Sequence, residues 1–332
     1  MNTTGFVKCA GALVGLAIIS ACGSAVAPSN AALNNTYMGH TLTVNGRLVT
    51  AAHANLSALP RYATFVPNRH AKPKAFEYII NFYGTYASVF DYPKSDQQIG
   101  KIKDVGGQGC TNVLYGYGKK TFWIVAGADR ITEYRVPKTP LETLSVPSGQ
   151  PSSCAMDTSG DLAVGNLANG DIIFFKHARG TGTVMTTPLS REYFDGYDPQ
   201  GNLFFDGFTA GSDVKLVELP KGRRTFRMIR TSNRVLFPGS VQWDGTYLTV
   251  TDQEANAMYQ YTVSGTKATL KGTVSLSGSV ECAQTWIATG IVFCADAGDY
   301  GAEVFNYPAG GSPIAVFTGN FDLPLGTVAV KR

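Results

Sequence analysis

From about residue 70 onward, hydrophobic residues occur in short runs separated by turn-forming residues. The runs are rich in β-branched and aromatic side chains, and Gly, Pro, Asn and Asp stand between them. The 3.6-residue spacing of an amphipathic helix is absent from this part of the chain. We therefore predict an all-β structure.

Two kinds of hydrophobic run recur at a nearly constant distance. Successive runs of the first kind begin 46, 40, 41, 45 and 43 residues apart, at Phe76, Phe122, Leu162, Leu203, Leu248 and Ile291. Runs of the second kind keep the same interval and occupy residues 89–93, 133–137, 172–176, 216–220, 259–263 and 304–308. A repeat of 40 to 50 residues with several strands per unit is typical of a β-propeller blade.

Each repeat predicts four antiparallel strands, A to D from the axis outward, in which the two runs are strands B and C. Six A strands are expected, near Cys110, Cys154, Tyr193, Val241, Cys282 and Val328. The B strand at Phe76 has no A strand before it, and the A strand at Val328 has no B strand after it. We expect these two to pair, which would close a six-bladed β-propeller over about 71–332 and remove its exposed edges. The alternative is seven blades, with 36–75 contributing one through a hairpin around Asn45-Gly46.

Three segments carry a resemblance to known propellers. Residues 156–164 and 241–252 resemble the repeats of NHL-type and related six-bladed propellers. The segment 305–314, with its Tyr-Pro-Ala-Gly phrase, resembles a group of uncharacterised, exported bacterial propeller proteins. The resemblance covers nearly the whole chain after residue 70. It implies the fold but no activity, because propellers serve as enzymes, binding proteins and scaffolds.

The N-terminus is typical of an exported protein. Lys8 precedes a short apolar core, and 19–22 (Ile-Ser-Ala-Cys) resembles a bacterial lipobox, which implies that Cys22 is acylated and becomes the first mature residue. We therefore predict a lipoprotein signal peptide over 1–21, a partly disordered tether over 22–70, and a lipid anchor in the cell envelope. We expect the anchor in the outer membrane, because Cys22 is followed by Gly23 and not by the Asp that often retains lipoproteins at the inner membrane. A plain signal peptide cut after Ala27, giving a secreted or periplasmic protein, and an uncleaved anchor are the alternatives.

Composition agrees with a folded, exported domain. Hydrophobic residues make up 44% of the 332 residues, which argues against a disordered chain, and the net charge of +4 gives no case for nucleic acid. Once Cys9 is removed and Cys22 is lipidated, an even number of cysteines remains, which suggests disulfides in an oxidising compartment. The candidate pairs are Cys110 with Cys154 and Cys282 with Cys294, and buried free thiols are the alternative.

Polar side chains cluster where the predicted B strands end and the A strands begin, which is one face of the ring. They are Asn81, Asn166, Asp206, Asp252, Glu281 and Asp296, with Glu192 at a further A strand. Such oxygens suit a hard cation such as Ca²⁺. Asp and Asn at strand ends also form Asx turns with their own backbone, and we favour that interpretation, so no cofactor is expected.

The same face is predicted to carry aromatic side chains: Tyr83, Phe208, Phe237 and Tyr300. Aromatic rings on a loop face can stack on sugars or on a partner protein, whereas packing between blades is the alternative role. A basic stretch, 221–230, is expected at the rim between strands C and D, where charge protects an edge or binds an anionic surface.

No catalytic motif is recognisable, and His177 is the one histidine within the predicted propeller. We therefore favour a monomeric, membrane-anchored propeller that binds a protein or glycan partner through its mouth face without catalysis. The alternative is a metal-dependent hydrolase or lyase, similar to gluconolactonase-type or virginiamycin-B-lyase-type propellers. Its ligand candidates would be Asp252, Asp296, Glu281 and Asn166. A scaffold role is a third hypothesis.

Overall fold

A computed structural model describes residues 41–44, 47–50, 75–83, 85–126, 129–147 and 150–332. The chain divides into two units, Met1–Leu59 and Pro60–Arg332. In the first unit, β1 (Thr41–Val44) pairs with β2 (Arg47–Thr50) in the antiparallel hairpin expected at this position. The predicted signal peptide, Cys22 and the rest of the predicted tether lie outside the described residues.

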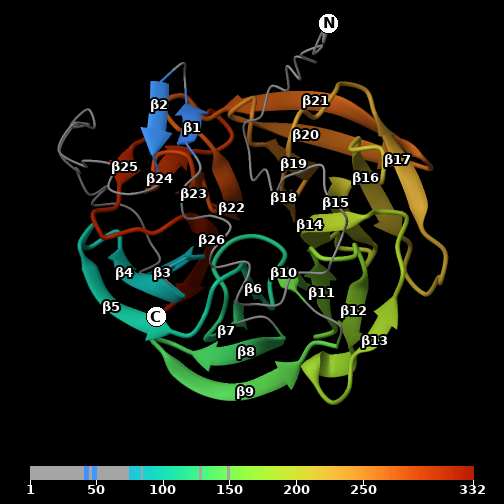
Figure 1. The fold of residues 1–332 in the computed structure, drawn as a ribbon, viewed down its shortest axis with the longest axis horizontal. Coiled ribbons are helices and arrows are strands. Elements are labelled where there is room, and N and C mark those ends of the chain that lie inside the picture. Colours follow the sequence, from blue (N-terminus) through green and yellow to red (C-terminus); the bar gives the residue numbers. More distant parts are fainter. Residues whose placement is uncertain (1–40, 45–46, 51–74, 84, 127–128, 148–149) are drawn as a thin grey trace, which may run out of the picture. The chain divides into compact units, whose positions relative to one another are not determined.

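The second unit consists of antiparallel sheets in a propeller-like arrangement around a common centre (Figure 1). Four sheets have four strands each, here given from the centre outward: β26 (Pro324–Lys331), β3 (Ala75–Asn81), β4 (Tyr86–Tyr92) and β5 (Gln98–Lys103); β6 (Gly109–Thr111), β7 (Thr121–Ala126), β8 (Arg130–Arg135) and β9 (Thr139–Ser145); β10 (Pro151–Met156), β11 (Leu162–Asn166), β12 (Ile172–Phe175) and β13 (Thr183–Met185); β22 (Cys282–Ala288), β23 (Ile291–Asp296), β24 (Gly301–Asn306) and β25 (Ala315–Val316).

A further sheet has eight strands, in the order β14 (Arg191–Tyr197), β15 (Leu203–Phe208), β16 (Val214–Leu219), β17 (Arg227–Thr231), β21 (Lys267–Ser275), β20 (Ala257–Ser264), β19 (Leu248–Asp252) and β18 (Pro238–Trp243). The helical content of the described residues is one 3₁₀ turn, Lys176–Ala178. The all-β prediction is confirmed: every predicted B run lies within a strand, and every predicted C run overlaps one. No helix among the described residues has the length and apolar character needed to span a membrane.

The C-terminal strand completes the sheet that begins with Phe76. In the pairing of β26 with β3, Val328 lies opposite Tyr78 and Thr327 lies opposite Ile79, as the unmatched A and B strands predicted. Around the centre, each inner strand contacts the next, in the order β6, β10, β14, β18, β22, β26 and back to β6.

The eight-stranded sheet arises from a contact that the repeat pattern does not predict. The outer strands β17 and β21 pair in parallel over two residue positions, Arg230 opposite Lys267 and Thr231 opposite Ala268. The backbone N–H groups of Arg230 and Ser232 donate to the carbonyl oxygens of Thr266 and Ala268 over 2.8 and 2.9 Å.

The core lies between the sheets, where the hydrophobic runs of the repeats pack face to face. Residues 121–126 of β7 show the pattern, because the run from Phe122 to Ala126 is buried on both faces of the strand. The structure joins Cys110 to Cys154 across neighbouring sheets, with Cα atoms 5.7 Å apart. It joins Cys282 to Cys294 within one sheet, with Cα atoms 5.5 Å apart. Both are the pairs that the predicted strand positions suggest.

Candidate functional site

Each of the B strands β3, β11, β19 and β23 ends beside the start of the inner strand of the same sheet. Asn166 pairs with Pro151, Asp252 with Pro238, Asp296 with Cys282 and Asn81 with Pro324. These four polar residues are therefore on the same face of the ring, which is called the mouth face below.

The carboxylates of Asp252 and Asp296 at the mouth face accept hydrogen bonds from several backbone N–H groups. Oδ2 of Asp296 accepts from Val280 over 2.7 Å, and Oδ1 accepts from Glu281, Gly298 and Asp299 over 2.9 to 3.2 Å. Asp252 has the same arrangement: Oδ2 accepts from Leu236 over 2.7 Å, and Oδ1 accepts from Phe237 and Ala255 over 3.2 Å. Each carboxylate thus closes an Asx turn and also holds the segment that leads into the inner strand.

The two asparagines play the same structural role. Oδ1 of Asn166 accepts from the N–H groups of Gln150, over 3.2 Å, and Ala168, over 3.0 Å. Oδ1 of Asn81 accepts from Asp322 N–H over 2.9 Å, and its Nδ2 donates to Tyr86 O over 3.2 Å. The arrangement supports the turn interpretation of these positions over cation binding.

Asp206 is out of register with the other four residues. It lies two residues before the end of β15, opposite Phe194, and its Oδ2 accepts from Gly239 N–H of the neighbouring inner strand over 3.1 Å. Its Oδ1 is buried and has no hydrogen-bond partner among the described residues. Burial raises the pKa of Asp206 well above its usual value, although the Gly239 hydrogen bond acts in the opposite direction.

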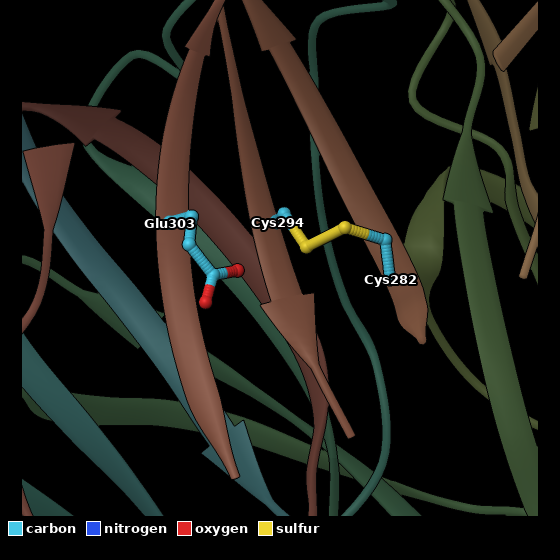
Figure 2. A group of neighbouring side chains, drawn as sticks. All are labelled: Cys282, Cys294 and Glu303. Carbon is cyan, nitrogen blue, oxygen red and sulfur yellow. A yellow bond between two sulfur atoms is a disulfide. The ribbon is translucent and has the colours of Figure 1, made fainter. Parts of the chain in front are cut away.

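The candidate cation ligands do not converge. Among the described residues, the one group of three His, Cys, Asp or Glu side chains close enough to share a metal ion is Cys282, Cys294 and Glu303 (Figure 2). The two sulfur atoms of this group are joined as a disulfide and are unavailable as thiolate ligands. Asp252, Glu281 and Asp296, the three carboxylates that the hydrolase or lyase alternative names beside Asn166, form no such group among the described residues.

A pair of buried carboxyl groups lies on β14. Glu192 accepts from Ser153 Oγ over 2.8 Å and from Ser152 Oγ over 3.1 Å. The carboxylate oxygens of Asp195 have no hydrogen-bond partner among the described residues. The hydroxyl group of the nearby Ser153 donates to Glu192 instead. Burial raises the pKa of both groups well above the usual range, and the charge of Asp195 raises that of Glu192 further. Sequence reasoning missed Asp195, for which a lone carboxylate inside the run Tyr-Phe-Asp-Gly-Tyr is the available signal.

Glutamine side chains bridge the axis of the ring. Gln108 Nε2 donates to Tyr193 O over 2.7 Å, and Gln284 Nε2 donates to Gly109 O over 2.9 Å. Gln242 Nε2 donates to Leu114 O over 3.1 Å. Beside Asp195 a cavity of about 30 Å³ remains, which has room for one or two water molecules. The glutamine side chains therefore span the axis at the level of these hydrogen bonds.

The four predicted binding-face aromatics separate into two pairs. Phe208 and Phe237 pack edge to face with Tyr193, with ring centroids 5.4 to 5.8 Å apart, and Phe237 is only 8% exposed. Tyr83 and Tyr300 remain partly exposed on the mouth face. The packing role thus accounts for the first pair, and Tyr83 also packs edge to face against Phe82, with ring centroids 5.7 Å apart.

A cleft of about 440 Å³ lies on the mouth face between β15–β17 and the β17–β18 connection. Asp206 and Leu216 lie at its wall on one side, and residues 229–236 line the other. The outer strands β17 and β21 are paired along this segment. The cleft therefore lies between the contact of the inner strands β14 and β18 and the contact of the outer strands β17 and β21.

The wall formed by residues 229–236 is held by side-chain hydrogen bonds. Tyr261 Oη donates to Asn233 Oδ1 over 2.8 Å, and Thr231 Oγ1 donates to Asn233 O over 2.7 Å. The wall carries the exposed Arg230 and Arg234, and neither forms an ion pair with any described residue. The predicted basic stretch includes Arg230, but nothing in the sequence places that residue in a cleft.

Comparison with known proteins shows the fold alone. No family model and no curated protein matches the chain. Solved structures do match. The nidogen/laminin complex has a TM-score of 0.60 and 12% identity, and the match covers 77% of this chain and 98% of that chain. A protein of unknown function from Bacteroides caccae has a TM-score of 0.59 and 10% identity, with 78% of this chain and 100% of that chain covered. A functionally unknown protein from Desulfotomaculum acetoxidans DSM 771 has a TM-score of 0.52 and 12% identity, with 77% of this chain and 99% of that chain covered. At these identities the likeness establishes a propeller-type fold and leaves the activity open.

Proposed function

We propose that the second unit is a six-bladed propeller in which the eight-stranded sheet counts as two blades. Strands β14–β17 and β18–β21 each follow the four-strand order of the other sheets, and only two residue pairs at their outer strands join them. The circuit of inner strands from β6 back to β6 supports the same count. Pairing of β26 with β3 closes the ring and gives β3 a partner along the edge that it would otherwise leave open.

The chain functions as a binding protein that takes its ligand on the mouth face and performs no catalysis. The observation that carries this proposal is the 440 Å³ cleft with two arginines that lack an acidic partner among the described residues. Its volume falls within the range of about 300 to 1,000 Å³ that ligand sites usually have. Asn81, Asn166, Asp252 and Asp296 accept hydrogen bonds from backbone N–H groups, and glutamine side chains bridge the axis, which favours the cleft as the binding site.

The partner is a protein or a glycan, and the partly exposed Tyr83 and Tyr300 extend the contact surface beyond the cleft. Acylation at Cys22 would hold the propeller at the bacterial envelope. Metabolic labelling with a palmitate analogue tests the anchor, since labelling of the wild-type chain and its loss in Cys22→Ser is the expected result. A secreted, unlabelled wild-type protein would contradict it.

The binding proposal is tested by a screen of the mature chain against envelope glycans and proteins, followed by a variant that fills the cleft. Ser232→Trp, at the cleft wall, is expected to abolish binding of a ligand found in the screen. Thr225→Trp, on the exposed β16–β17 turn and outside the cleft, is the matched control and should bind normally. Unchanged thermal unfolding shows that both variants fold. Equal binding by both would contradict the site, and turnover of a lactone or ester would favour the catalytic alternative.

A further inference from the structure

We infer that the cleft recognises an acidic saccharide, meaning a sugar unit that carries a carboxylate or a phosphate group. The inference rests on the proposed function, because it names the ligand class of the same cleft. It is argued from the charges, the polar groups and the rigidity of the residues that line the cleft.

The positive charge of the cleft is not balanced by the protein. On the same strand as Arg230, Arg227 lies at the rim and pairs with Glu218 over 3.3 Å, and Lys215 pairs with Asp213 over 3.6 Å. Arg230 and Arg234 are the two lining cations without such a partner among the described residues. Guanidinium groups bind planar or tetrahedral oxyanions through paired hydrogen bonds, so the pair favours a carboxylate or phosphate ligand.

The acid at the inner wall does not cancel this charge. Asp206 is completely buried, and its carboxyl group is in contact with Gly239 N–H and lies near Asp252 and Asp195. Because burial raises the pKa of Asp206 well above its usual value, its neutral form is favoured relative to an exposed aspartate. The cleft therefore keeps a net positive potential that attracts anions.

The remaining lining is suited to a hydroxylated ligand. Ser232 Oγ accepts from Leu270 N–H over 2.8 Å, which leaves its own O–H to donate to a ligand, and Ser212 adds a second exposed hydroxyl. Ile229 and Leu236 contribute apolar surface beside these polar groups. A sugar ring presents hydroxyl groups at its edge and C–H groups on its faces, so it can use both kinds of surface.

The recognition wall is already in place before a ligand arrives. Asn233 accepts hydrogen bonds at its side chain and its backbone, and the adjacent residues pair with β21. A pre-ordered site loses little conformational entropy on binding, which allows a small ligand to bind measurably.

The test is a titration of the full mature chain with each probe at low ionic strength, in which calorimetry measures the binding. The probes are glucuronic acid, glucose 6-phosphate, glucose and inorganic phosphate. We expect both acidic sugars to bind and glucose to bind at least about tenfold more weakly than either. Phosphate alone should bind more weakly than glucose 6-phosphate. Arg230→Gln and Arg234→Gln should each weaken binding of the acidic sugars about tenfold. Arg224→Gln, on the exposed turn outside the cleft, should change binding less than about twofold.

The outcomes separate the inference from the proposed function. If glucose binds as tightly as glucuronic acid and the arginine variants are unaffected while Ser232→Trp abolishes binding, the cleft is a binding site but the acidic class is wrong. If phosphate alone binds as tightly as glucose 6-phosphate, the site selects an inorganic anion and the saccharide is overturned. If no probe binds and Ser232→Trp also leaves every ligand from the wider screen unaffected, both proposals fail.

Discussion

Gln242 and Leu114 are hydrogen-bonded across the propeller axis, with Gln242 Nε2 donating to Leu114 O over 3.1 Å. Gln242 belongs to β18, and Leu114 follows β6, which lies on the other side of the circuit of inner strands. The same side chain accepts at Oε1 from Ile287 N–H of β22 over 2.9 Å. One buried amide therefore connects three inner strands, so it should contribute to the stability of the whole ring.

Replacement of this amide should destabilise the fold. Gln242→Ala leaves the half-buried Leu114 carbonyl and the buried Ile287 N–H group without their partner, which is expected to lower the free energy of unfolding by about 1 to 3 kcal/mol. Urea denaturation followed by tryptophan fluorescence measures the change. Gln200→Ala, on the exposed β14–β15 turn, is the control and should stay within about 0.5 kcal/mol of the wild type. Equal stability of the two variants would show that the bridge is dispensable.

Much of this fold is predictable from the sequence because the strand pattern repeats. Hydrophobic runs mark the buried B and C strands, and the unmatched strands at Phe76 and Val328 predict the closing pair. The polar residues at the strand ends also fall on one face, since register follows from strand order. Local periodicity and connectivity thus determine where these residues lie.

The cleft and the axial bridges are not predictable in the same way. The parallel contact between β17 and β21 involves backbone groups, which carry no residue-specific signal. The partners of Gln108, Gln242 and Gln284 are mostly backbone groups of other blades. Asp206 follows the sequence pattern of Asp252, but β15 continues for two residues beyond Asp206, whereas β19 ends at Asp252. Such features depend on how blades meet in three dimensions.

The buried acid Glu192 should make the fold less stable as the pH rises. Burial, followed by the charge of Asp195, raises its pKa above that of the unfolded chain, so between these two values the native state binds more protons. Its favourable contribution is complete below the unfolded pKa of about 4.3 and is lost as the pH rises through the native pKa. Glu192→Gln cannot ionise, so it avoids this loss of stability. Its free energy of unfolding is expected to exceed that of the wild type at pH 8, and the difference between the two proteins should shrink toward pH 4.

Urea denaturation between pH 4 and pH 8 measures this dependence. Glu142→Gln, an exposed substitution on β9, is the matched control and should run parallel to the wild-type curve. If Glu192→Gln is less stable than the wild type at pH 8, then the ionised carboxylate and its two serine hydrogen bonds stabilise the fold, and the argument from burial is wrong.

The charge of Asp296 should be detectable in the titration of its neighbour Asp299. Burial raises the pKa of Asp299 to about 6, and the charge of Asp296 adds to the effect. Asp296→Asn is expected to lower the pKa of Asp299 only in part, because burial is the larger cause. Carbon NMR of the side-chain carboxyls measures both titrations. An unchanged Asp299 pKa would contradict the electrostatic contact, and a shift on addition of Ca²⁺ to the wild type would contradict the turn role of Asp296.

The two disulfides should differ in their contribution to stability because they close loops of different length. Cys110 and Cys154 are 44 residues apart, whereas Cys282 and Cys294 are 12 apart. In the chain-entropy description, the longer loop restricts the unfolded chain more, by about 1 kcal/mol in free energy. The double variant Cys110→Ala/Cys154→Ala should therefore lose about 1 kcal/mol more than Cys282→Ala/Cys294→Ala in urea denaturation under oxidising conditions. Mass spectrometry after alkylation verifies that the remaining pair is oxidised in each variant. The reverse order of stability would mean that native-state packing around Cys282 and Cys294, both completely buried, outweighs loop length.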